Sequence, residues 1–387
     1  MTPVPGRYLI VAGDPSGDLL AEGLVRAIRK LAPGTRFAAL GGSRLKASAD
    51  TFLEDLVSQY AGGFWIPLGK LLFFRRTLAG VVRRELAEGD LTGVILVDFY
   101  GFNRHVAELA HRHGKPVFYY ACPQFWASRP GRLEKIRRFV SRFLVLFPFE
   151  VEFYRARGLS ATFVGHPLLD PILESSSNGR ARHVEPLIGL LPGSRPQEVL
   201  RHLPVMLEAC DRIWAECPRA RFVLFVAPGL DSGAYSGLLE SGKRRPYLLE
   251  VVRDEGYAWR SQLDAAITAS GLETLENALL GIPMVVIYKM PWITYGVARS
   301  VVTVPWISMP NLLAGKPIVP ELIQSLARPE PIARILAGWL RNPGELERLH
   351  GELAALKRKF GEPGASERAA RVILEAAGGV ETGAGVT

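Results

Sequence analysis

Short apolar runs recur along this chain and are separated by longer amphipathic stretches. Parallel strands that are buried on both faces need continuous apolar runs, and the helices that cover them need one apolar side. The pattern therefore predicts an α/β protein in which strands and helices alternate. Six strands are predicted in the first half of the chain, at residues 8–12, 37–40, 94–98, 117–121, 143–147 and 162–164.

A second series of strands follows a polar, serine-rich stretch at residues 174–180. Its members are residues 187–191, 222–226, 248–252, 265–268 and 284–288. Because 387 residues suit two domains of about 150, we expect two doubly wound, Rossmann-like domains that face each other across a ligand cleft. The expected parts are an N-terminal domain (1–173), a linker (174–182), a C-terminal domain (183–328), further helices (329–377) and a flexible tail (378–387).

The charge balance is basic, with 47 Lys and Arg against 38 Asp and Glu, which gives 47 − 38 = +9. Such a surplus favours phosphorylated ligands, nucleic acid or an anionic membrane surface. The three cysteines and seven histidines lack metal-ligand spacing, so we expect a reducing compartment, no disulfide framework, no metal and no cofactor. No run of 18 uncharged apolar residues occurs, so any membrane contact should be peripheral.

The first strand leads into a glycine-containing loop, Gly13-Asp-Pro-Ser-Gly-Asp18, and then into a helix. Its carboxylates disfavour a phosphate, whereas Ser16, Gly17 and Asp18 suit a hydroxyl-rich sugar. An ordinary helix cap formed by Ser16 or Asp18 explains the same residues. The sequence alone leaves both interpretations open.

Asp98 ends the apolar run of residues 94–97, where open α/β sheets carry their reactive groups. Aromatic residues follow it, and a carboxylate in such surroundings can have the raised pKa of a general base. The alternative is that Asp98, or Asn103, caps the next helix.

Two more loops join a predicted strand to a helix in the second half. Gly193 and Ser194 can present backbone N–H groups, and Arg195 can pair with a diphosphate, although a surface arginine is the alternative. Ser270 and Gly271 begin the other loop, and Ser270 with Glu273 has the spacing of a capping box.

Glu276 lies one turn beyond Glu273 and can accept hydrogen bonds from ribose hydroxyls, or can be a solvated helix charge. His166 follows a strand and can reach a ligand, although a packed histidine explains it equally well. The segment Leu71, Leu72, Phe73, Phe74, Arg75 and Arg76 mixes apolar and basic residues, which suits either a membrane surface or a core helix with a basic outer side. A basic cluster at residues 129–142 comes without a nucleic-acid-binding module, so no nucleic acid is expected.

Taken together, the chain resembles the lipid-A-disaccharide synthases, inverting glycosyltransferases of the two-Rossmann-domain (GT-B) type. The resemblance runs in unbroken order over most of the chain. It rests on the opening A-G-x-x-S-G-D loop, Asp98 with Phe102-Asn103, Trp126-Ala-Ser-Arg129, Phe147-Pro-Phe-Glu150, Phe163-Val-Gly-His-Pro167, Leu191-Pro-Gly-Ser-Arg195, Ala269-Ser-Gly271, Leu275-Glu276, Pro283-Met-Val-Val286, Ser308-Met-Pro-Asn-Leu-Leu-Ala-Gly315 and Val319-Pro-Glu-Leu322.

The resemblance implies that the chain joins UDP-2,3-diacylglucosamine to 2,3-diacylglucosamine 1-phosphate through a β-1,6 bond and releases UDP. It implies Asp98 as the catalytic base, with Arg195 and Asn311 at the nucleotide sugar. It also implies a cytoplasmic enzyme at the surface of the inner membrane, with the family's tendency to form a homodimer.

The chain departs from the family pattern at Leu272, at Glu273, at residues 61–65 and in Cys122-Pro-Gln-Phe-Trp-Ala-Ser-Arg129. These differences keep other functions open. The alternatives are a related transferase of the muramyl-pathway N-acetylglucosaminyltransferase type, a UDP-N-acetylglucosamine 2-epimerase, and a non-catalytic lipid-binding relative.

Overall fold

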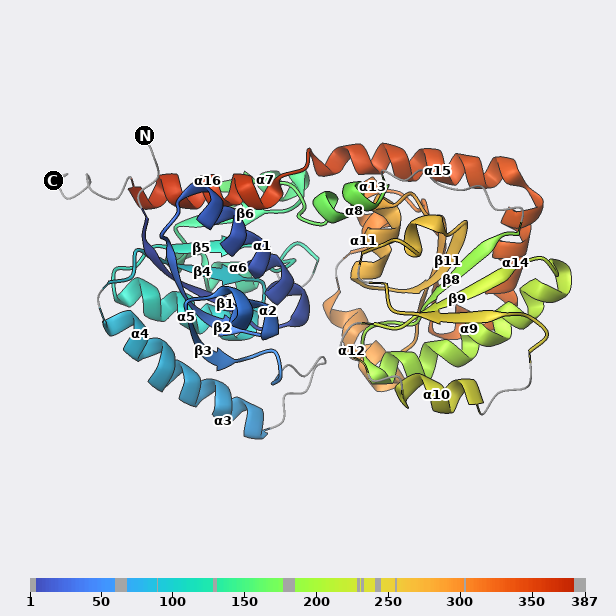
Figure 1. Cartoon of the computed structure of the whole chain (residues 1–387), viewed down its shortest axis with the longest axis horizontal. Coiled ribbons are helices and arrows are strands. Elements are labelled where there is room, and N and C mark those ends of the chain that lie inside the picture. The colour runs from blue at the N-terminus through green and yellow to red at the C-terminus, as the bar shows by residue number, and fades with distance from the viewer. Residues whose placement is uncertain are drawn as a thin grey trace. The chain divides into compact units, whose positions relative to one another are not determined.

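The computed structural model describes residues 5–59, 68–88, 90–127, 131–176, 185–227, 230, 233–240, 245–254, 256–302 and 304–378. The chain divides into two compact units, Met1–Pro167 with Phe360–Thr387 and Leu168–Lys359. Each unit is built around its own parallel sheet, as Figure 1 shows. The predicted α/β class with two doubly wound sheets is confirmed.

The first unit contains a seven-stranded sheet in the order β3-β2-β1-β4-β5-β6-β7, and all its neighbouring strands are parallel. Its strands are β1 (Arg7–Ala12), β2 (Arg36–Gly41), β3 (Thr51–Asp55), β4 (Gly93–Val97), β5 (Val117–Tyr120), β6 (Arg142–Val145) and β7 (Ala161–Phe163). Its helices are α1 (Pro15–Leu31), α2 (Ser43–Ser48), α3 (Leu68–Arg76), a π-helical segment (Thr77–Val82), α4 (Arg83–Ala87), α5 (Tyr100–Arg112), α6 (Gly131–Glu134), α7 (Pro148–Arg155) and α16 (Ala365–Gly378).

The second unit contains a six-stranded parallel sheet in the order β10-β9-β8-β11-β12-β13. Its strands are β8 (Leu187–Leu191), β9 (Arg221–Phe225), β10 (Leu249–Val252), β11 (Ala265–Ala269), β12 (Met284–Tyr288) and β13 (Glu321–Ile323). Its helices are α8 (Leu169–Ser176), α9 (Pro196–Glu216), α10 (Gly233–Glu240), α11 (Leu272–Leu279), α12 (Trp292–Val301), α13 (Met309–Ala314), α14 (Pro329–Arg341) and α15 (Pro343–Lys357).

The structure adds two strands that the apolar runs did not predict, β3 and β13. Both lie at the edge of their sheet and are three to five residues long. No residue of either strand is fully buried. Edge strands need no continuous apolar run, so their sequences carry little signal.

Several helices begin with proline in the first turn, where a missing backbone N–H costs nothing and the fixed φ suits the helix. These residues are Pro15, Pro148, Pro196, Pro329 and Pro343. Helices α1, α7, α9 and α14 contact the strands of their sheets, whereas α15 packs against α11, α13 and α14. In the second unit, for example, Leu203 of α9 and Leu336 of α14 share one core cluster with Leu190 of β8.

In both units the strand order reverses direction at the centre of the sheet. In the first unit the reversal lies between β1 and β4, where Ala12 pairs with Val97, so the residues that follow, Gly13 and Asp98, end neighbouring strands. In the second unit it lies between β8 and β11, where Leu191 pairs with Thr268. Ligands of open α/β sheets bind at such reversals, at the carboxyl ends of the strands.

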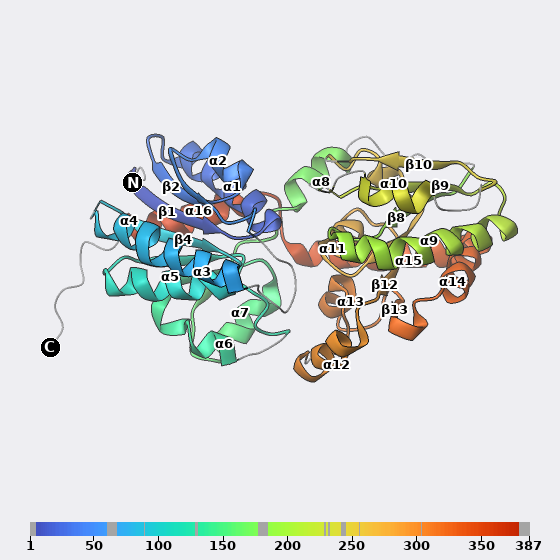
Figure 2. The same ribbon diagram turned by 90° about the horizontal axis from the view of Figure 1, so that it is seen from below.

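The observed division of the chain differs from the expected boundaries. Helix α8, which spans the end of the expected first domain and the start of the expected linker, belongs to the second unit, and α16 belongs to the first unit. Helix α16 buries Ala369, Ala370 and Ile373, and Figures 1 and 2 both place it alongside α1. Because α16 packs against the first unit, the C-terminal helices are divided between the two units. Most of the expected linker and tail lies outside the described residues.

Candidate functional site

Asp98 occupies an unusual turn directly after β4. Its φ is 41° and that of Phe99 is 47°, so two consecutive residues other than glycine adopt the left-handed region. Such backbone costs of order 1–3 kcal/mol per residue and persists only where the surroundings enforce it. The turn therefore presents the Asp98 carboxyl in a fixed geometry.

Three neighbours enforce this turn. The Asn103 side-chain amide donates to the Asp98 carbonyl oxygen at 2.8 Å and to the Val97 carbonyl at 3.1 Å. The Tyr119 hydroxyl donates to the same Asp98 carbonyl at 2.6 Å. Gly13 leaves room for the Phe99 side chain, because a Cβ atom at Gly13 would lie 1.9 Å from the Phe99 ring. Neither Asp98 nor Asn103 caps α5, whose cap residue is Phe99.

The pKa of the Asp98 carboxyl is raised to about 7. Burial is the main cause, because it disfavours the charged form, and the nearby Asp14 carboxylate is the second. The Phe99 backbone opposes the rise by hydrogen bonding to the carboxyl. A carboxyl with this pKa can take up a proton near neutral pH, as a general base must.

In the loop after β1, the residue that caps α1 is not one of the two that the sequence suggested. Asp14, and neither Ser16 nor Asp18, caps α1, accepting from the Gly17 amide at 2.7 Å. Asp18 is buried and accepts from the Gly42 and Arg44 amides at 2.8 and 3.0 Å, so it anchors α2. Gly17 is buried, whereas Ser16 is exposed in the first turn of α1.

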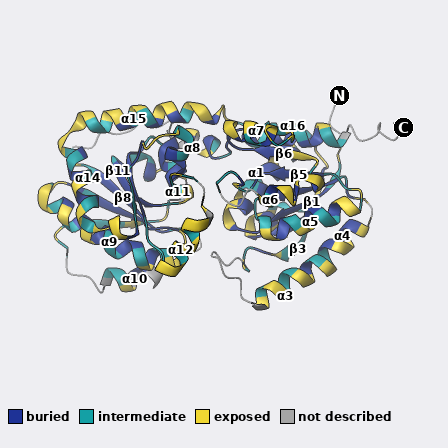
Figure 3. Ribbon diagram, turned by 180° about the vertical axis from the view of Figure 1, so that it is seen from behind, coloured by how far each residue is buried: buried dark blue, intermediate teal, exposed yellow. Residues whose placement is uncertain are grey.

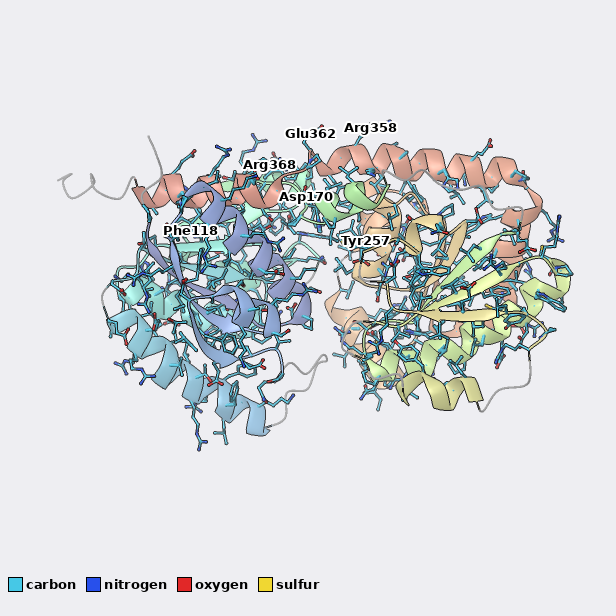
Figure 4. All side chains as sticks on the ribbon, in the orientation of Figure 1. Phe118, Asp170, Tyr257, Arg358, Glu362 and Arg368 are labelled. Atoms are coloured by element: carbon cyan, nitrogen blue, oxygen red, sulfur yellow. The ribbon has the colours of Figure 1, made fainter. Side chains whose placement is uncertain are left out.

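His166 is packed rather than open. It is buried against the rings of Phe147 and Phe360, with ring centroids 5.5 and 6.2 Å away. Burial lowers its pKa to about 3, so the imidazole is neutral. The neighbouring segment is held by Arg368 of α16, labelled in Figure 4, which donates to the Val164 carbonyl at 2.8 Å.

In the second unit, Gly193, Ser194 and Arg195 lie between β8 and α9, at the strand reversal. Gly193 has a φ of 112°, and a Cβ atom there would come within 2.6 Å of the Glu198 carboxylate. Only glycine fits both constraints. Ser194 and Arg195 are exposed, and the Arg195 guanidinium pairs with Glu198 at 2.7 Å.

Ser270 and Gly271 lie in the adjacent loop, between β11 and α11. The capping box predicted for Ser270 and Glu273 is wrong, because the Ser270 hydroxyl instead donates to the Ile307 carbonyl at 2.8 Å. Gly271 is the cap residue, and Thr274 donates to its carbonyl at 2.8 Å. Glu273 turns back toward Gly271, and burial, followed by the Glu276 carboxylate, raises its pKa to about 7.

Glu276 belongs to a buried polar cluster at the start of α11. One carboxylate oxygen accepts from the Tyr257 hydroxyl at 2.9 Å, and the other pairs with the guanidinium of Arg260. Arg260 also lies 5.5 Å from the ring centres of Phe225 and Tyr257. Figure 4 labels Tyr257 beside α11. The cluster holds Glu276 in one orientation.

Asn311 is fully engaged inside the second unit. Its amide nitrogen donates to the Val319 carbonyl and to Glu321, both at 2.8 Å. Its oxygen accepts from the Ile318 and Val319 amides at 2.8 and 2.9 Å. These four bonds use its whole hydrogen-bonding capacity, so Asn311 shapes the loop before β13.

The apolar and basic segment predicted to touch a membrane forms α3, but its residues do not share one environment. Leu71 and Leu72 are exposed, as are Arg75 and Arg76. Phe73 and Phe74 are half-buried against the core, and Phe74 lies 5.8 Å from the ring of Phe99. Phe73 and Phe74 are therefore less open to solvent than Leu71 and Leu72, and the membrane contact of the segment stays a prediction. Within the described residues, no helix is long and apolar enough to cross a bilayer.

Sequence reasoning missed the residues that support the site. Asp14, Tyr119, Arg260 and Tyr257 act on Asp98 or Glu276 from other elements. Only Asp14 had a local signal, because it precedes a proline at a helix start. The others meet their partners through tertiary packing. The loop at residues 61–65 and the residues from Ser128 to Pro130 lie outside the described residues.

Comparison of the sequence with known proteins gives consistent results. A family model described as lipid-A-disaccharide synthetase matches residues 8–363. The lipid-A-disaccharide synthase of Geobacter sulfurreducens is 37% identical over 378 residues, which cover 96% of this chain and 97% of that protein. The lipid-A-disaccharide synthase of Syntrophus aciditrophicus is 40% identical over 379 residues, with coverages of 95% and 96%.

Solved structures share the fold at low sequence identity. UDP-N-acetylglucosamine 2-epimerase from Neisseria meningitidis, bound to UDP-GlcNAc, aligns with a TM-score of 0.63 at 12% identity and covers 96% of this chain and 99% of its own. MurG from Acinetobacter baumannii aligns with a TM-score of 0.61 at 15% identity, with coverages of 96% and 100%. These likenesses show the fold, and the sequence matches over nearly the whole chain show that this chain belongs to the lipid-A-disaccharide synthetase family.

Proposed function

We propose that this chain is the glycosyltransferase that joins UDP-2,3-diacylglucosamine to 2,3-diacylglucosamine 1-phosphate and releases UDP. Family membership supports the reaction. The observation that carries the mechanism is Asp98, a carboxyl of raised pKa in an enforced turn at the strand reversal of the first unit. That position is where an open α/β sheet binds its ligand.

In the proposed reaction the acceptor's 6-hydroxyl oxygen attacks the anomeric carbon of the donor. The new carbon–oxygen bond forms as the bond to the UDP phosphate breaks, and the electron pair leaves with UDP. Asp98 takes the hydroxyl proton. A single base suffices because attack from the face opposite UDP inverts the anomeric centre in one step.

The second unit supplies the proposed donor site. Arg195, together with the backbone of Gly193 and Ser194 at the start of α9, is suited to the diphosphate, because a guanidinium and a helix N-terminus both favour anions. The pair with Glu198 involves one guanidinium nitrogen, Nη1, and we expect a bound diphosphate to compete with Glu198 for Arg195. Ser270 and Gly271 lie beside this loop. We assign Glu276, whose carboxylate is held by Tyr257 and Arg260, to the ribose hydroxyls.

Other residues of the predicted site act on these groups through the fold. Asn311 and Asp18 are engaged with backbone amides, and His166 is packed between aromatic rings. We therefore assign them positioning roles. Ser16 and Gly17 remain with Asp98 as candidates for the acceptor sugar. We also propose a peripheral membrane contact at α3 through Leu71 and Leu72 with Arg75 and Arg76, because both substrates carry acyl chains.

The reaction is tested by incubating the purified chain with both substrates in detergent and measuring products by mass. The proposal predicts a disaccharide 1-phosphate and one UDP per disaccharide. A parallel reaction without acceptor identifies an epimerase, which would convert the UDP-sugar alone. Disaccharide formation from a different acceptor only, or conversion without acceptor, would contradict the proposal.

A further inference from the structure

Helix α12 contributes an apolar surface that the fold of its own unit does not cover. Trp292 is 67% exposed, Ile293 86% and Val297 48%. These residues lie on one side of the helix with Gly296, since positions three and four residues apart are neighbours on a helix surface. No described side chain of α12 is fully buried, and Figure 3 shows much of the helix as exposed.

The chain segment that contains α12 carries charge of one sign. Residues 277–320 contain no Asp or Glu and three cations, Lys289, Arg299 and Lys316. Lys316 pairs with Glu352, and the Lys289 ammonium donates to the Ala327 carbonyl at 3.3 Å. Arg299 is exposed on α12 itself, and among the described residues no carboxylate pairs with it. An anionic partner therefore meets an attractive charge and no repelling carboxylate in this segment.

We propose that α12 lies in the headgroup layer of an anionic lipid bilayer, with Trp292, Ile293 and Val297 inserted and Arg299 against lipid phosphates. Tryptophan prefers this layer, where its ring is in apolar surroundings and its N–H stays wet. Surface helices of this kind combine an apolar side with basic residues. The inference rests on the proposed function, whose substrates carry acyl chains, and it gives the donor-binding unit its own membrane contact.

A second copy of the chain fits this surface less well. A stable protein interface buries about 800 Å² on each partner, more than three side chains of a ten-residue helix provide. In a symmetric dimer through α12, the Arg299 residues would also lie on the same patch and repel each other.

Vesicle sedimentation of the full chain tests the inference. We compare Trp292→Ser/Ile293→Ser with wild type on phosphatidylcholine vesicles that contain about one-third phosphatidylglycerol. The double variant should bind about tenfold more weakly, through the loss of two inserted side chains. Arg299→Gln should bind about fivefold more weakly to these vesicles and unchanged to pure phosphatidylcholine. Leu326→Ser removes a leucine that is 54% exposed elsewhere in the unit and should bind as wild type.

Two further measurements separate the possible failures. Disaccharide synthesis from substrates dissolved in detergent should be unchanged in the α12 variants, and its absence in wild type would contradict the proposed function rather than this inference. Equal vesicle binding of wild type and Trp292→Ser/Ile293→Ser would overturn the inference. So would a dimer in light scattering that the double substitution dissociates while vesicle binding persists.

Discussion

At the residue scale, the reactivity of the site depends on how the fold changes the pKa of a few carboxyl groups. The Asp98 carboxyl has a pKa of about 7 because desolvation disfavours its charged form and because Asp14 is near. The same fold uses Asp14 as the cap of α1. One residue therefore starts the first helix and tunes the proposed base.

Replacing Asp14 by Asn tests this coupling. Asn caps helices about as well as Asp, so the fold should persist. Removing the negative charge should lower the pKa of Asp98. Because the base must be deprotonated, the acid limb of kcat/KM, expected near pH 7 in wild type, should move to lower pH. Asp55→Asn, at the end of edge strand β3, is the control and should leave the limb in place. If the acid limb of kcat/KM stayed at the same pH in Asp14→Asn, the proposed coupling between Asp14 and Asp98 would be excluded.

Replacing Arg195 by Ala tests the proposed donor site. Arg195→Ala should weaken UDP binding by about 1.5 to 3 kcal/mol, because one charge-assisted hydrogen bond is lost. Calorimetry measures this, with Arg212→Ala at the far end of α9 as the control that should bind UDP normally. Unchanged UDP affinity in Arg195→Ala would remove it from the proposed site.

The limits of sequence reasoning are visible at this scale. The carboxyl end of β4 was predictable, because the apolar run of this buried strand stops at Val97 and the charged Asp98 follows it. The hydrogen bonds from Asn103 and Tyr119 were not, because Tyr119 lies on the next strand and the left-handed turn has no glycine to signal it. Asn311 matches the family pattern, but the sequence does not show that its side-chain amide already makes all its hydrogen bonds within the fold.

At the element scale, each strand reversal places two loops side by side. Central strands were predictable from their apolar runs, whereas the edge strands β3 and β13 were not. Helix α3 shows that the exposure of neighbouring apolar residues is also hard to predict from sequence. Its apolar residues are consecutive in the sequence, but the helix sends Phe74 toward the core and leaves Leu71 and Leu72 exposed.

This division predicts two separable effects in α3. Leu71→Ser/Leu72→Ser should reduce sedimentation with anionic vesicles and leave the melting temperature unchanged. Phe74→Ser should lower the free energy of unfolding by about 2 kcal/mol, since a packed aromatic side chain is lost. Vesicle binding as strong as wild type in the leucine variant would contradict the proposed contact at α3.

At the scale of the whole molecule, the chain leaves the first unit after Pro167 and returns to it at Phe360. Helix α16 therefore stabilises a fold that begins more than 300 residues earlier. The sequence predicted a helix there, but its assignment to the first unit depends on packing against α1.

A buried charge in α16 tests this assignment. Ala370→Glu should destabilise the first unit by about 3 kcal/mol or more, because Ala370 is fully buried. UDP affinity, assigned to the second unit, should persist. Arg371→Glu, at the exposed neighbouring position, is the control for charge alone. Loss of UDP binding in step with the loss of stability would contradict the assignment.

The central claim is that Asp98 is the base of the glycosyl transfer. The most direct measurement is kcat for Asp98→Asn, taken with the UDP dissociation constant and the melting temperature of the same preparation. Asn keeps the shape but cannot take the proton, so kcat should fall by about 10² to 10⁴-fold. UDP affinity should not change, and the melting temperature should not fall, since burial disfavours the ionised carboxyl. Turnover near that of wild type would contradict the claim.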